Sequence, residues 1–563
     1  MIRVNILLGL TPEDGMARTA IGNLLRRVAA EHQAADALGV RPEVVHAMGP
    51  DLVRLELSRR QLLGGAVAAV GAVTLGQLPF AERANAAVAN PRIAVIGAGI
   101  SGLAAALRMQ DSGLACTVYE ANTRLGGRMF SDTTTWASGQ VSEWGGELID
   151  TGHKTIQALA RRFNLPLDDL VQAEPQQAEQ TFYFFGQHYP YKQACSDFQT
   201  VHQNIQNDMH TFSWPVTWNN PQPGGGTTLS NLSAYDWIET RVPGGHSSPM
   251  GALLDVAYNE EYGGQTTDQT ALNILGLLAY QPNPGQFSVF GLSDERYHIR
   301  GGNDRLPKAI AGALPRGSIN LNWKLTALAT NSNGTQTLTF YANGKSQTVT
   351  ADHTVLAVPL GVLQRLDFSR AGFDNRKKGQ IASMRMGHDC KLQLQFANRM
   401  WNGPGAWPGI SSGESYSDTG TMNTWEATRA QPGAEGILVD YTGGDLAAAL
   451  NPSTPFSDQT NPYVVTSAET FLRQIEPVFP GLGTQWNGRA TLSAWHVNPY
   501  AYGAYSYWPT GYCHNYAGYE AIRQGNVHFA GEHCSIDYQG YMEGGATEGQ
   551  RAGVEVLGDY GLK

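Results

Sequence analysis

The sequence predicts an α/β fold built on a parallel sheet, and two observations carry this prediction. The first is the run RIAVIGAGISG from Arg92 to Gly102, where an apolar, β-branched strand leads directly into the pattern G-x-G-x-x-G. The second is the Ala/Leu-rich helical stretch Leu103–Met109, followed by a second strand over 115–119. That strand ends in Glu120, an acid about 20 residues past the glycines, which is typical of a dinucleotide-binding βαβ unit.

Each glycine of the pattern has a predicted task. Gly97 makes the tight turn, Gly99 lets the backbone approach a pyrophosphate, and Gly102 lets the helix pack closely on the strand. The N-terminus of that helix offers unpaired N–H groups to the phosphates. Glu120 is placed to accept the ribose hydroxyls.

The composition sets limits on the function. A chain of 563 residues, 42% hydrophobic and 16% charged, describes a globular protein with a large core and more than one domain. A net charge of −10 without a basic run argues against nucleic acid as a partner and weakly favours cationic small molecules. The five cysteines show neither a disulfide framework nor C-x-x-C spacing, and we expect no metal site.

Two further motifs give the chain a family resemblance. The run RLGGR, Arg124–Arg128, comes directly after Glu120, and the pair Gly145-Gly146 follows. This combination resembles the flavin amine oxidase superfamily, which binds FAD. The resemblance implies that Gly127, Arg128, Gly145 and Gly146 lie at the pyrophosphate and flavin side of the cofactor.

The C-terminal region strengthens the resemblance. FAGEH at 529–533 looks like the family's turn whose acid contacts the ribityl chain, which implies cofactor roles for Gly531 and Glu532. GYMEGG at 540–545 looks like a helix start aimed at the flavin pyrimidine edge, which implies roles for Tyr541 and Met542. In the family, a buried strand such as the one containing Val355 completes the cofactor domain.

The resemblance implies a Rossmann-like FAD-binding domain of the GR2 type, interleaved with an α+β substrate-binding domain. The expected parts are FAD-binding segments at 91–153, 293–368 and 486–563, with substrate-domain segments at 154–292 and 369–485.

The N-terminal 90 residues carry a targeting signal. Ser58-Arg59-Arg60-Gln61-Leu62-Leu63 precedes a glycine-interrupted apolar run and an A-x-A site at 84–86, which together predict a twin-arginine export signal and linker over 58–90. Residues 1–57 form a leader of unknown role. We therefore expect a periplasmic or extracellular protein with no stable membrane span after processing, and a simple membrane anchor is the alternative.

Three residues are candidates for the reacting centre. In monoamine oxidases the stretch matching Asn498–Tyr505 ends in a flavin-linked cysteine and a tyrosine; here Ala504 and Tyr505 stand at those positions, which implies non-covalent FAD. Tyr505 and Tyr541 correspond to the family's aromatic cage, which holds an amine before the flavin. Lys391, four residues after Gly387, has the spacing of the family's lysine that holds a water near flavin N5. Its alternative place is a solvated strand face, because polar and apolar residues alternate there.

The substrate is inferred from the run WGGELID at 144–150. L-amino acid oxidases of the family usually carry an arginine after the second glycine pair, where this chain has Leu148. Glu147 and Asp150 can attract a cation, although an exposed turn explains them equally well. The residues favour an amine without a carboxylate, unless Arg296 or Arg300 supplies the missing guanidinium.

The leading hypothesis is an FAD-dependent amine oxidase, in which hydride passes from a small-molecule amine to flavin N5 and O2 becomes H2O2. The first alternative is an L-amino acid oxidase of the same fold. The second is a flavin amine dehydrogenase or flavin-carrying binding protein that uses little oxygen. The oligomeric state is left open, with a homodimer considered.

Overall fold

The computed structural model describes residues 91–282 and 286–562. The predicted leader 1–57 and the twin-arginine segment 58–90 lie outside the described residues. Residue contacts divide the chain after Ala86, and everything below concerns the second unit, Ala87–Lys563. Within the described part of this unit, no helix combines the length and apolar character needed to cross a membrane.

A five-stranded parallel sheet forms around the strand that precedes the glycine pattern, with the order β24-β13-β1-β2-β9. Its strands are β1 (Ile93–Ile96), β2 (Thr117–Tyr119), β9 (Ile319–Asn320), β13 (His353–Leu356) and β24 (Val527–Phe529). β1 and β13 are buried along their whole length, as expected of a parallel sheet that is covered on both faces. Three distant segments of the chain therefore meet in one sheet.

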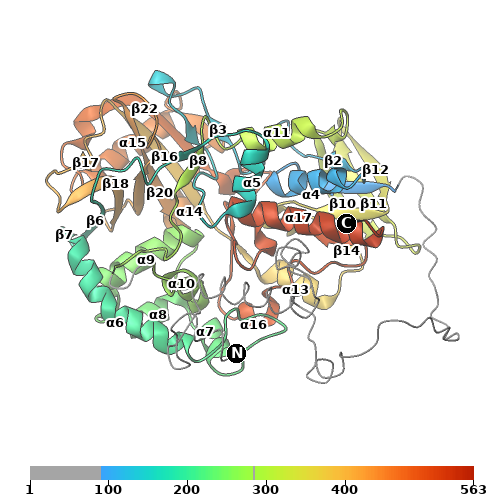
Figure 1. Ribbon diagram of the computed structural model, residues 1–563, viewed down its shortest axis with the longest axis horizontal. Helices are drawn as coiled ribbons and strands as arrows, with labels where there is room; N and C mark the ends of the chain where they lie inside the picture. Colours follow the sequence, from blue (N-terminus) through green and yellow to red (C-terminus); the bar gives the residue numbers. More distant parts are fainter. Residues whose placement is uncertain (1–90, 283–285, 563) are drawn as a thin grey trace, which may run out of the picture. The chain divides into compact units, whose positions relative to one another are not determined.

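Helices pack beside this sheet, and two of them touch through glycine (Figure 1). α4 (Ile100–Asp111) follows β1, and α17 (Met542–Asp559) lies along it. A Cβ atom on Gly549 of α17 would lie 2.1 Å from the Ser101 carbonyl oxygen, so only glycine permits this backbone approach. α11 (Arg305–Ala313) also packs on α4, and α5 (Lys154–Arg162) packs on α17.

A second, four-stranded sheet has the order β12-β11-β10-β14. Its strands are β10 (Trp323–Thr330), β11 (Gln336–Ala342), β12 (Lys345–Ala351) and β14 (Asp367–Arg370). Two tight turns connect these strands: Asn331 and Thr335 close the first hairpin, and Asn343 and Gly344 both adopt positive φ in the second.

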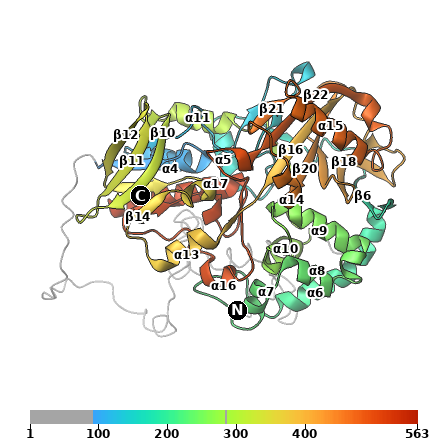
Figure 2. The ribbon, with the colours of Figure 1, turned by 180° about the vertical axis from the view of Figure 1, so that it is seen from behind.

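A nine-stranded sheet, seen from both sides in Figures 1 and 2, has the order β21-β22-β16-β20-β19-β18-β6-β7, with β17 paired to β18. Its strands are β6 (Ala178–Phe184), β7 (Gln187–Tyr189), β16 (Asp389–Phe396), β17 (Asn402–Gly403), β18 (Ile410–Ser417), β19 (Asn423–Glu426), β20 (Gly436–Gly443), β21 (Phe456–Asp458) and β22 (Trp486–Ala494). β22 pairs with β16, so the chain returns to the parallel sheet later than the expected boundary at residue 486.

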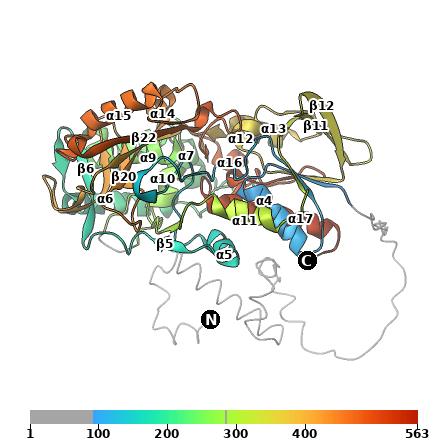
Figure 3. The same ribbon diagram turned by 90° about the horizontal axis from the view of Figure 1, so that it is seen from above.

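Helices enclose this sheet, and Figure 3 gives a view from above. α9 contacts β6, β18 and β20, whereas α15 packs with Leu392 and Leu394 of β16 in a separate core. The helices in this part are α6 (Tyr191–Met209), α7 (Gly225–Asn231), α8 (Ala234–Arg241), α9 (Pro249–Tyr262), α10 (Ala271–Leu278), α14 (Gly444–Ala449) and α15 (Pro462–Ile475).

Short elements complete the described residues. They are the strands β3 (Ser131–Asp132), β4 (Ser142–Glu143), β5 (Leu167–Asp169), β8 (Tyr297–Ile299), β15 (Arg385–Met386) and β23 (Ser506–Tyr507), and the helices α12 (Leu360–Leu363), α13 (Asn375–Ser383) and α16 (Cys513–Tyr516). The fold is thus mixed α/β, as the sequence predicts.

Candidate active site

One cavity extends from the carboxyl ends of the parallel strands to the inner face of the nine-stranded sheet. Gly97, Tyr119 and Ala357, at or just past the ends of β1, β2 and β13, line the first end, and Lys391 and Tyr441 line the second. Ligands of open α/β sheets bind outside the carboxyl ends of the strands, so this cavity is in the expected place.

The glycine turn has the predicted geometry. Gly97 has φ +105°, and a Cβ atom there would lie 2.5 Å from the Ala357 carbonyl oxygen. A Cβ atom on Gly102 would lie 2.0 Å from the Gly97 carbonyl oxygen, so Gly102 keeps the helix close to the strand. Gly99 lines the cavity, whereas Gly102 acts through packing and does not.

Glu120 stands at the cavity end beside this turn. Its carboxylate accepts hydrogen bonds from the Ala98 N–H (2.7 Å) and the Asn122 N–H (2.8 Å). Burial raises the pKa of Glu120, and these backbone N–H groups partly offset the rise. Glu120 is held where it can accept hydrogen bonds from the hydroxyl groups of a ligand in the cavity.

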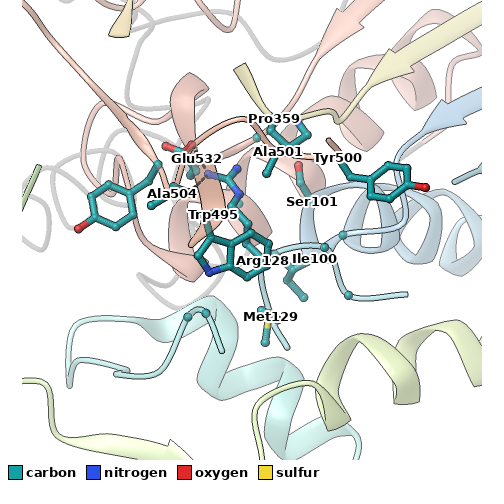
Figure 4. A pocket seen from close by; sticks show the side chains of 18 of the residues that line it. Ile100, Ser101, Arg128, Met129, Pro359, Trp495, Tyr500, Ala501, Ala504 and Glu532 are labelled. Carbon is teal, nitrogen blue, oxygen red and sulfur yellow. Dashed lines mark hydrogen bonds and ion pairs between the residues drawn. The ribbon is translucent and has the colours of Figure 1, made fainter. Parts of the chain in front are cut away.

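Arg128 forms a partly buried ion pair with Glu532 (Figure 4). One guanidinium nitrogen lies 2.8 Å from Glu532 Oε1 and 2.7 Å from the Ala504 carbonyl oxygen. The other Glu532 oxygen accepts from Ser506 Oγ (2.7 Å) and the Gly540 N–H (3.1 Å). Burial acts to raise the pKa of Glu532, but the Arg128 and His533 charges and the hydrogen bonds from Arg128 and Ser506 together lower the pKa below its usual range. Both predicted residues line the cavity.

The second glycine pair lies between Arg128 and the start of α17. Gly127 also lines this part, next to Gly99. A Cβ atom on Gly145 would lie 2.1 Å from the Arg128 carbonyl oxygen, and one on Gly146 would lie 3.0 Å from the Met542 side chain. No side chain caps the N-terminus of α17, so its first N–H groups remain available to a negatively charged ligand group.

Lys391 is buried and paired within the cavity wall. Its Nζ donates to Glu147 Oε2 (2.6 Å) and to the Gly145 carbonyl oxygen (2.9 Å). Glu147 also accepts from Trp425 Nε1 (3.0 Å). All of β16 is buried, so the alternative of a solvated strand face is wrong for Lys391, and an exposed turn is wrong for Glu147.

Tyr505 and Tyr541 line the same cavity. The Tyr505 hydroxyl lies 2.9 Å from the Tyr441 hydroxyl and 3.3 Å from the Glu260 carbonyl oxygen. The Tyr541 hydroxyl donates to Glu261 Oε1 (3.1 Å). Tyr441 was not predicted from the sequence. It faces the cavity because β19 and β20 complete the wall beside β16.

Three acids that the sequence did not single out also line the cavity: Glu261, Glu295 and Asp389. They come from α9, from the loop before β8 and from the first residue of β16. A signal for Asp389 was present, because it lies two residues before Lys391 and therefore on the same face of the strand. No local sequence motif marks Glu261 or Glu295, because only the tertiary fold places them at the cavity.

Two other predicted site residues, Asp150 and Val355, do not line the cavity. Leu148 lines the cavity, but Asp150 does not: its carboxylate accepts from Ser293 Oγ (2.9 Å) and the Glu295 N–H (3.0 Å). Asp150 therefore supports the loop that carries Glu295 and does not make the substrate contact that the sequence predicts. Val355 is buried in the middle of β13 and does not line the cavity either.

The two arginines that the sequence offers as alternative contacts for a substrate carboxylate are paired elsewhere. Arg296 binds Asp169 (2.7 Å) and Arg300 binds Asp168 (2.7 Å). Neither lines the cavity.

Among the described residues, His353, His528 and Asp559 bring potential metal-ligating atoms within 4.8 Å of one another. None of them lines the cavity. Arg523 already pairs with Asp559 at 2.8 Å, so this group has a cationic partner of its own.

Comparisons with known proteins agree with this geometry. Residues 100–557 match the sequence model of the family described as flavin containing amine oxidoreductase. An L-amino-acid oxidase from Mus musculus is 23% identical, over 84% of this chain and 71% of its own. Polyamine oxidase 6 from Oryza sativa subsp. japonica is 23% identical, over 82% and 90%. The structure of cyclohexylamine oxidase from Brevibacterium oxydans superposes with a TM-score of 0.68 at 20% identity, covering 84% of this chain and 99% of that one.

Proposed function

This chain belongs to the flavin-containing amine oxidoreductase family, and we propose that it is an FAD-dependent oxidase of a small amine that carries no carboxylate. It is an oxidoreductase that acts on CH–NH2 donors, with O2 as the co-substrate that the family implies. The substrate class rests on one observation: the described lining holds two arginines, and each already has a partner, Arg128 in Glu532 and Arg124 in the Gly127 carbonyl oxygen.

The residues fit FAD as the form of the flavin. Gly97, Gly99 and Gly127 leave backbone without side chains at the N-terminus of α4, where a pyrophosphate is favoured. Glu120 would hold the adenosine ribose, and the Arg128–Glu532 pair would lie beside the ribityl chain of the FAD. The parallel sheet with its α4 crossover supports a Rossmann-like cofactor domain built from the segments 91–153 and 293–368 and the last part of the chain.

Non-covalent attachment is supported by the residues around the cavity. Ala504 occupies the position at which the resemblance would place a flavin-linked cysteine, and it lines the cavity. None of the described lining residues is a cysteine. All five cysteines are free, and no thiol faces the ligand site.

A bound flavin would supply the acceptor for the hydride of the amine and the donor of electrons to O2. The protein's own residues position the reactants. Tyr505 and Tyr541 present aromatic rings that can hold the amine, and the hydroxyl contacts of both rings fix their orientation. The Lys391 ammonium, held by Glu147, would supply a positive charge that stabilises the negative charge developing on oxygen.

An amino acid fits this site less well than an amine. A substrate carboxylate needs an arginine, ideally in bidentate contact. Leu148 is apolar, Arg296 and Arg300 bind aspartates, and Arg128 is bound to Glu532. A carboxylate would meet the side chains of Glu261, Glu295 and Asp389 instead, and none of these supplies a positive charge.

The test is anaerobic bleaching of the flavin absorbance by tyramine and L-tyrosine, which differ only in the carboxylate. We expect rapid bleaching by tyramine and a slow or undetectable reaction with L-tyrosine. Bleaching by L-tyrosine alone would replace the proposal by an L-amino acid oxidase. Bleaching without H2O2 release in air would indicate a dehydrogenase.

Export through the twin-arginine route stays a proposal that rests on residues 58–63. Replacing both Arg59 and Arg60 by lysine should retain the enzyme in the cytoplasm. Fractionation of cells expressing the two forms would measure this, and equal export of the variant would contradict it.

A further inference from the structure

Two histidines of the parallel sheet lie side by side on the face that α17 covers. His353 is the first residue of β13, and His528 of β24 is in register with Val355 of β13. Alternate residues of a strand share a face, so His353, Val355 and His528 point to the same side of the sheet. Val355 packs in one core with Val556 and Leu557 of α17. The two imidazoles therefore face the C-terminal part of this helix.

Asp559, the last residue of α17, completes a triangle of potential ligand atoms. His353 Nδ1 lies 3.2 Å from His528 Nε2 and 3.5 Å from Asp559 Oδ2, and the latter two atoms are 3.9 Å apart. Three atoms that bind one Zn²⁺ tetrahedrally at about 2.0–2.1 Å are about 3.3–3.4 Å from one another. The three observed distances lie close to this value, so small side-chain movements would bring all three atoms into coordination.

His528 already has the partner that orients a metal-binding histidine. Its Nδ1 lies 2.9 Å from Glu555 Oε2, and Arg551 binds the other Glu555 oxygen. A carboxylate can only accept a hydrogen bond, so Nδ1 of the neutral ring carries the proton and Nε2 presents its lone pair to His353. A carboxylate on the second nitrogen is typical of histidines that bind zinc, because it fixes the tautomer and the ring orientation.

Asp559 is held in place and keeps acceptor capacity. Arg523 Nη1 lies 3.0 Å from Asp559 Oδ1 and 2.8 Å from Oδ2. An ionised carboxylate has about four acceptor positions, so this contact leaves a lone pair for a metal ion. The Asp559 side chain is 30% exposed, whereas those of His353 and His528 are 8% and 0% exposed. An ion can therefore enter from the Asp559 side, where water completes the coordination.

We propose that His353, His528 and Asp559 bind one Zn²⁺ or a similar transition-metal ion. Two imidazole nitrogens and one carboxylate oxygen suit Zn²⁺ better than Mg²⁺ or Ca²⁺, which prefer oxygen ligands. On binding, His353 gives up the hydrogen bond from Nδ1 to His528, and its ring proton moves to Nε2. The ion would connect β13 and β24 to the C-terminal end of α17, near the end of the chain in Figure 1.

This site is separate from the proposed oxidase function, because none of its three residues lines the cavity. The sequence predicts no metal site, since the cysteines lack metal-binding spacing. The three ligands come from different elements, β13, β24 and α17, so no short motif joins them. Only the pairing of the strands and the packing of the helix bring them together.

The test is zinc binding to the purified holoenzyme without a histidine-containing tag. Equilibrium dialysis against micromolar ZnCl2, followed by metal analysis, should give close to one Zn²⁺ per chain, and an equal concentration of Mg²⁺ should not compete. The Tm should rise by about 2–3 °C at a free Zn²⁺ concentration of about 100 times Kd, because the ion binds only the folded arrangement. No saturable Zn²⁺ binding to the wild-type protein, or binding without a rise in Tm, would overturn the proposal.

Three isosteric variants of α17 locate the bound ion. Asp559→Asn removes an anionic ligand and should weaken Zn²⁺ binding at least about 100-fold. Glu555→Gln removes the carboxylate behind His528 and should weaken it about 10–100-fold. Glu548→Gln is the control, because Glu548 binds Arg551 on the same helix but contributes no atom to the triangle. Zn²⁺ binding that Asp559→Asn leaves unchanged, or equal weakening in all three variants, would also overturn the proposal.

Discussion

At the scale of single residues, Lys391 shows how a charge can be kept inside the protein. A buried ion pair is tolerated only where hydrogen bonds satisfy both partners. Here the ammonium has Glu147 and the Gly145 carbonyl oxygen, and Glu147 has Trp425 as well. The pair therefore holds a fixed positive charge at the end of the cavity where the tyrosines lie.

We predict that Lys391→Met slows reoxidation of the reduced flavin by O2 by about 10²-fold, because a positioned positive group is lost. Stopped-flow mixing with oxygenated buffer measures this rate, and anaerobic reduction by substrate should change less. A double variant with Glu147→Gln avoids leaving an unpaired buried carboxylate. Lys324→Met removes a charge from the other end of the cavity and should leave the oxygen reaction unchanged. An unchanged rate in Lys391→Met would reject the assigned role.

At the scale of secondary structure elements, glycine determines how closely α17 approaches α4. Gly549 faces Ser101, and Gly545 lies near Ile100 at the start of α4. This contact sets the position of the N-terminus of α17, where Met542 and Tyr541 line the cavity. Packing between the helices and the geometry of the site are thus linked through one helix.

Two substitutions in α17 test this link. Gly549→Ala should destabilise the protein by about 1–3 kcal/mol and lower its affinity for FAD, because the new Cβ overlaps backbone. Gly558→Ala lies in the same helix with nothing within 4 Å of its Cβ, and should be neutral or stabilising by up to about 1 kcal/mol. Chemical denaturation and flavin titration measure both quantities. Similar results for the two variants would show that the close approach is unimportant.

At the scale of the whole molecule, buried carboxylates make stability depend on pH. The pKa of Glu261 is raised to about 8 by burial and that of Glu520 to about 7 by burial, so the folded state binds protons that the unfolded state releases. The free energy of unfolding should therefore fall as pH rises from 6.5 to 8. Burial lowers the pKa values of His153 and His353 to about 4. Between about pH 4 and 6.5 the unfolded state therefore binds more protons at these histidines, which makes the free energy of unfolding rise with pH there. The decline due to the buried acids is therefore expected above pH 6.5.

The measurement is the Tm of the substrate-free enzyme at pH 6.5, 7, 7.5 and 8. We expect a steady decline, and Glu261→Gln should make it shallower because one of the titrating groups is removed. A Tm that is constant or rises across this range would contradict the assignment of a raised pKa to Glu261.

Local sequence determined the end of the cavity beside the glycine turn. The turn at Gly97, the packing of Gly102 and the place of Glu120 follow from contacts between neighbouring segments, which short motifs encode. The hairpin turns at Gly334 and Asn343 are local in the same way, because each depends on one or two residues that adopt positive φ.

Only the tertiary structure decided the substrate end. The sequence leaves open whether Lys391 lies on a solvated or a buried face of its strand. In the structure, α15 and the segment carrying Glu147 cover β16, so the strand is buried. Asp150 and Glu295 come from segments far apart in the chain. The Asp150 carboxylate accepts a hydrogen bond from the Glu295 N–H and so supports the loop, whereas the Glu295 side chain lines the cavity. Alternation along a strand fixes which side chains share a face, but the partner of each face depends on long-range packing. The motifs therefore specified the glycine turn and the residues around it, and the assembly of distant strands and loops specified the side chains at the other end of the cavity.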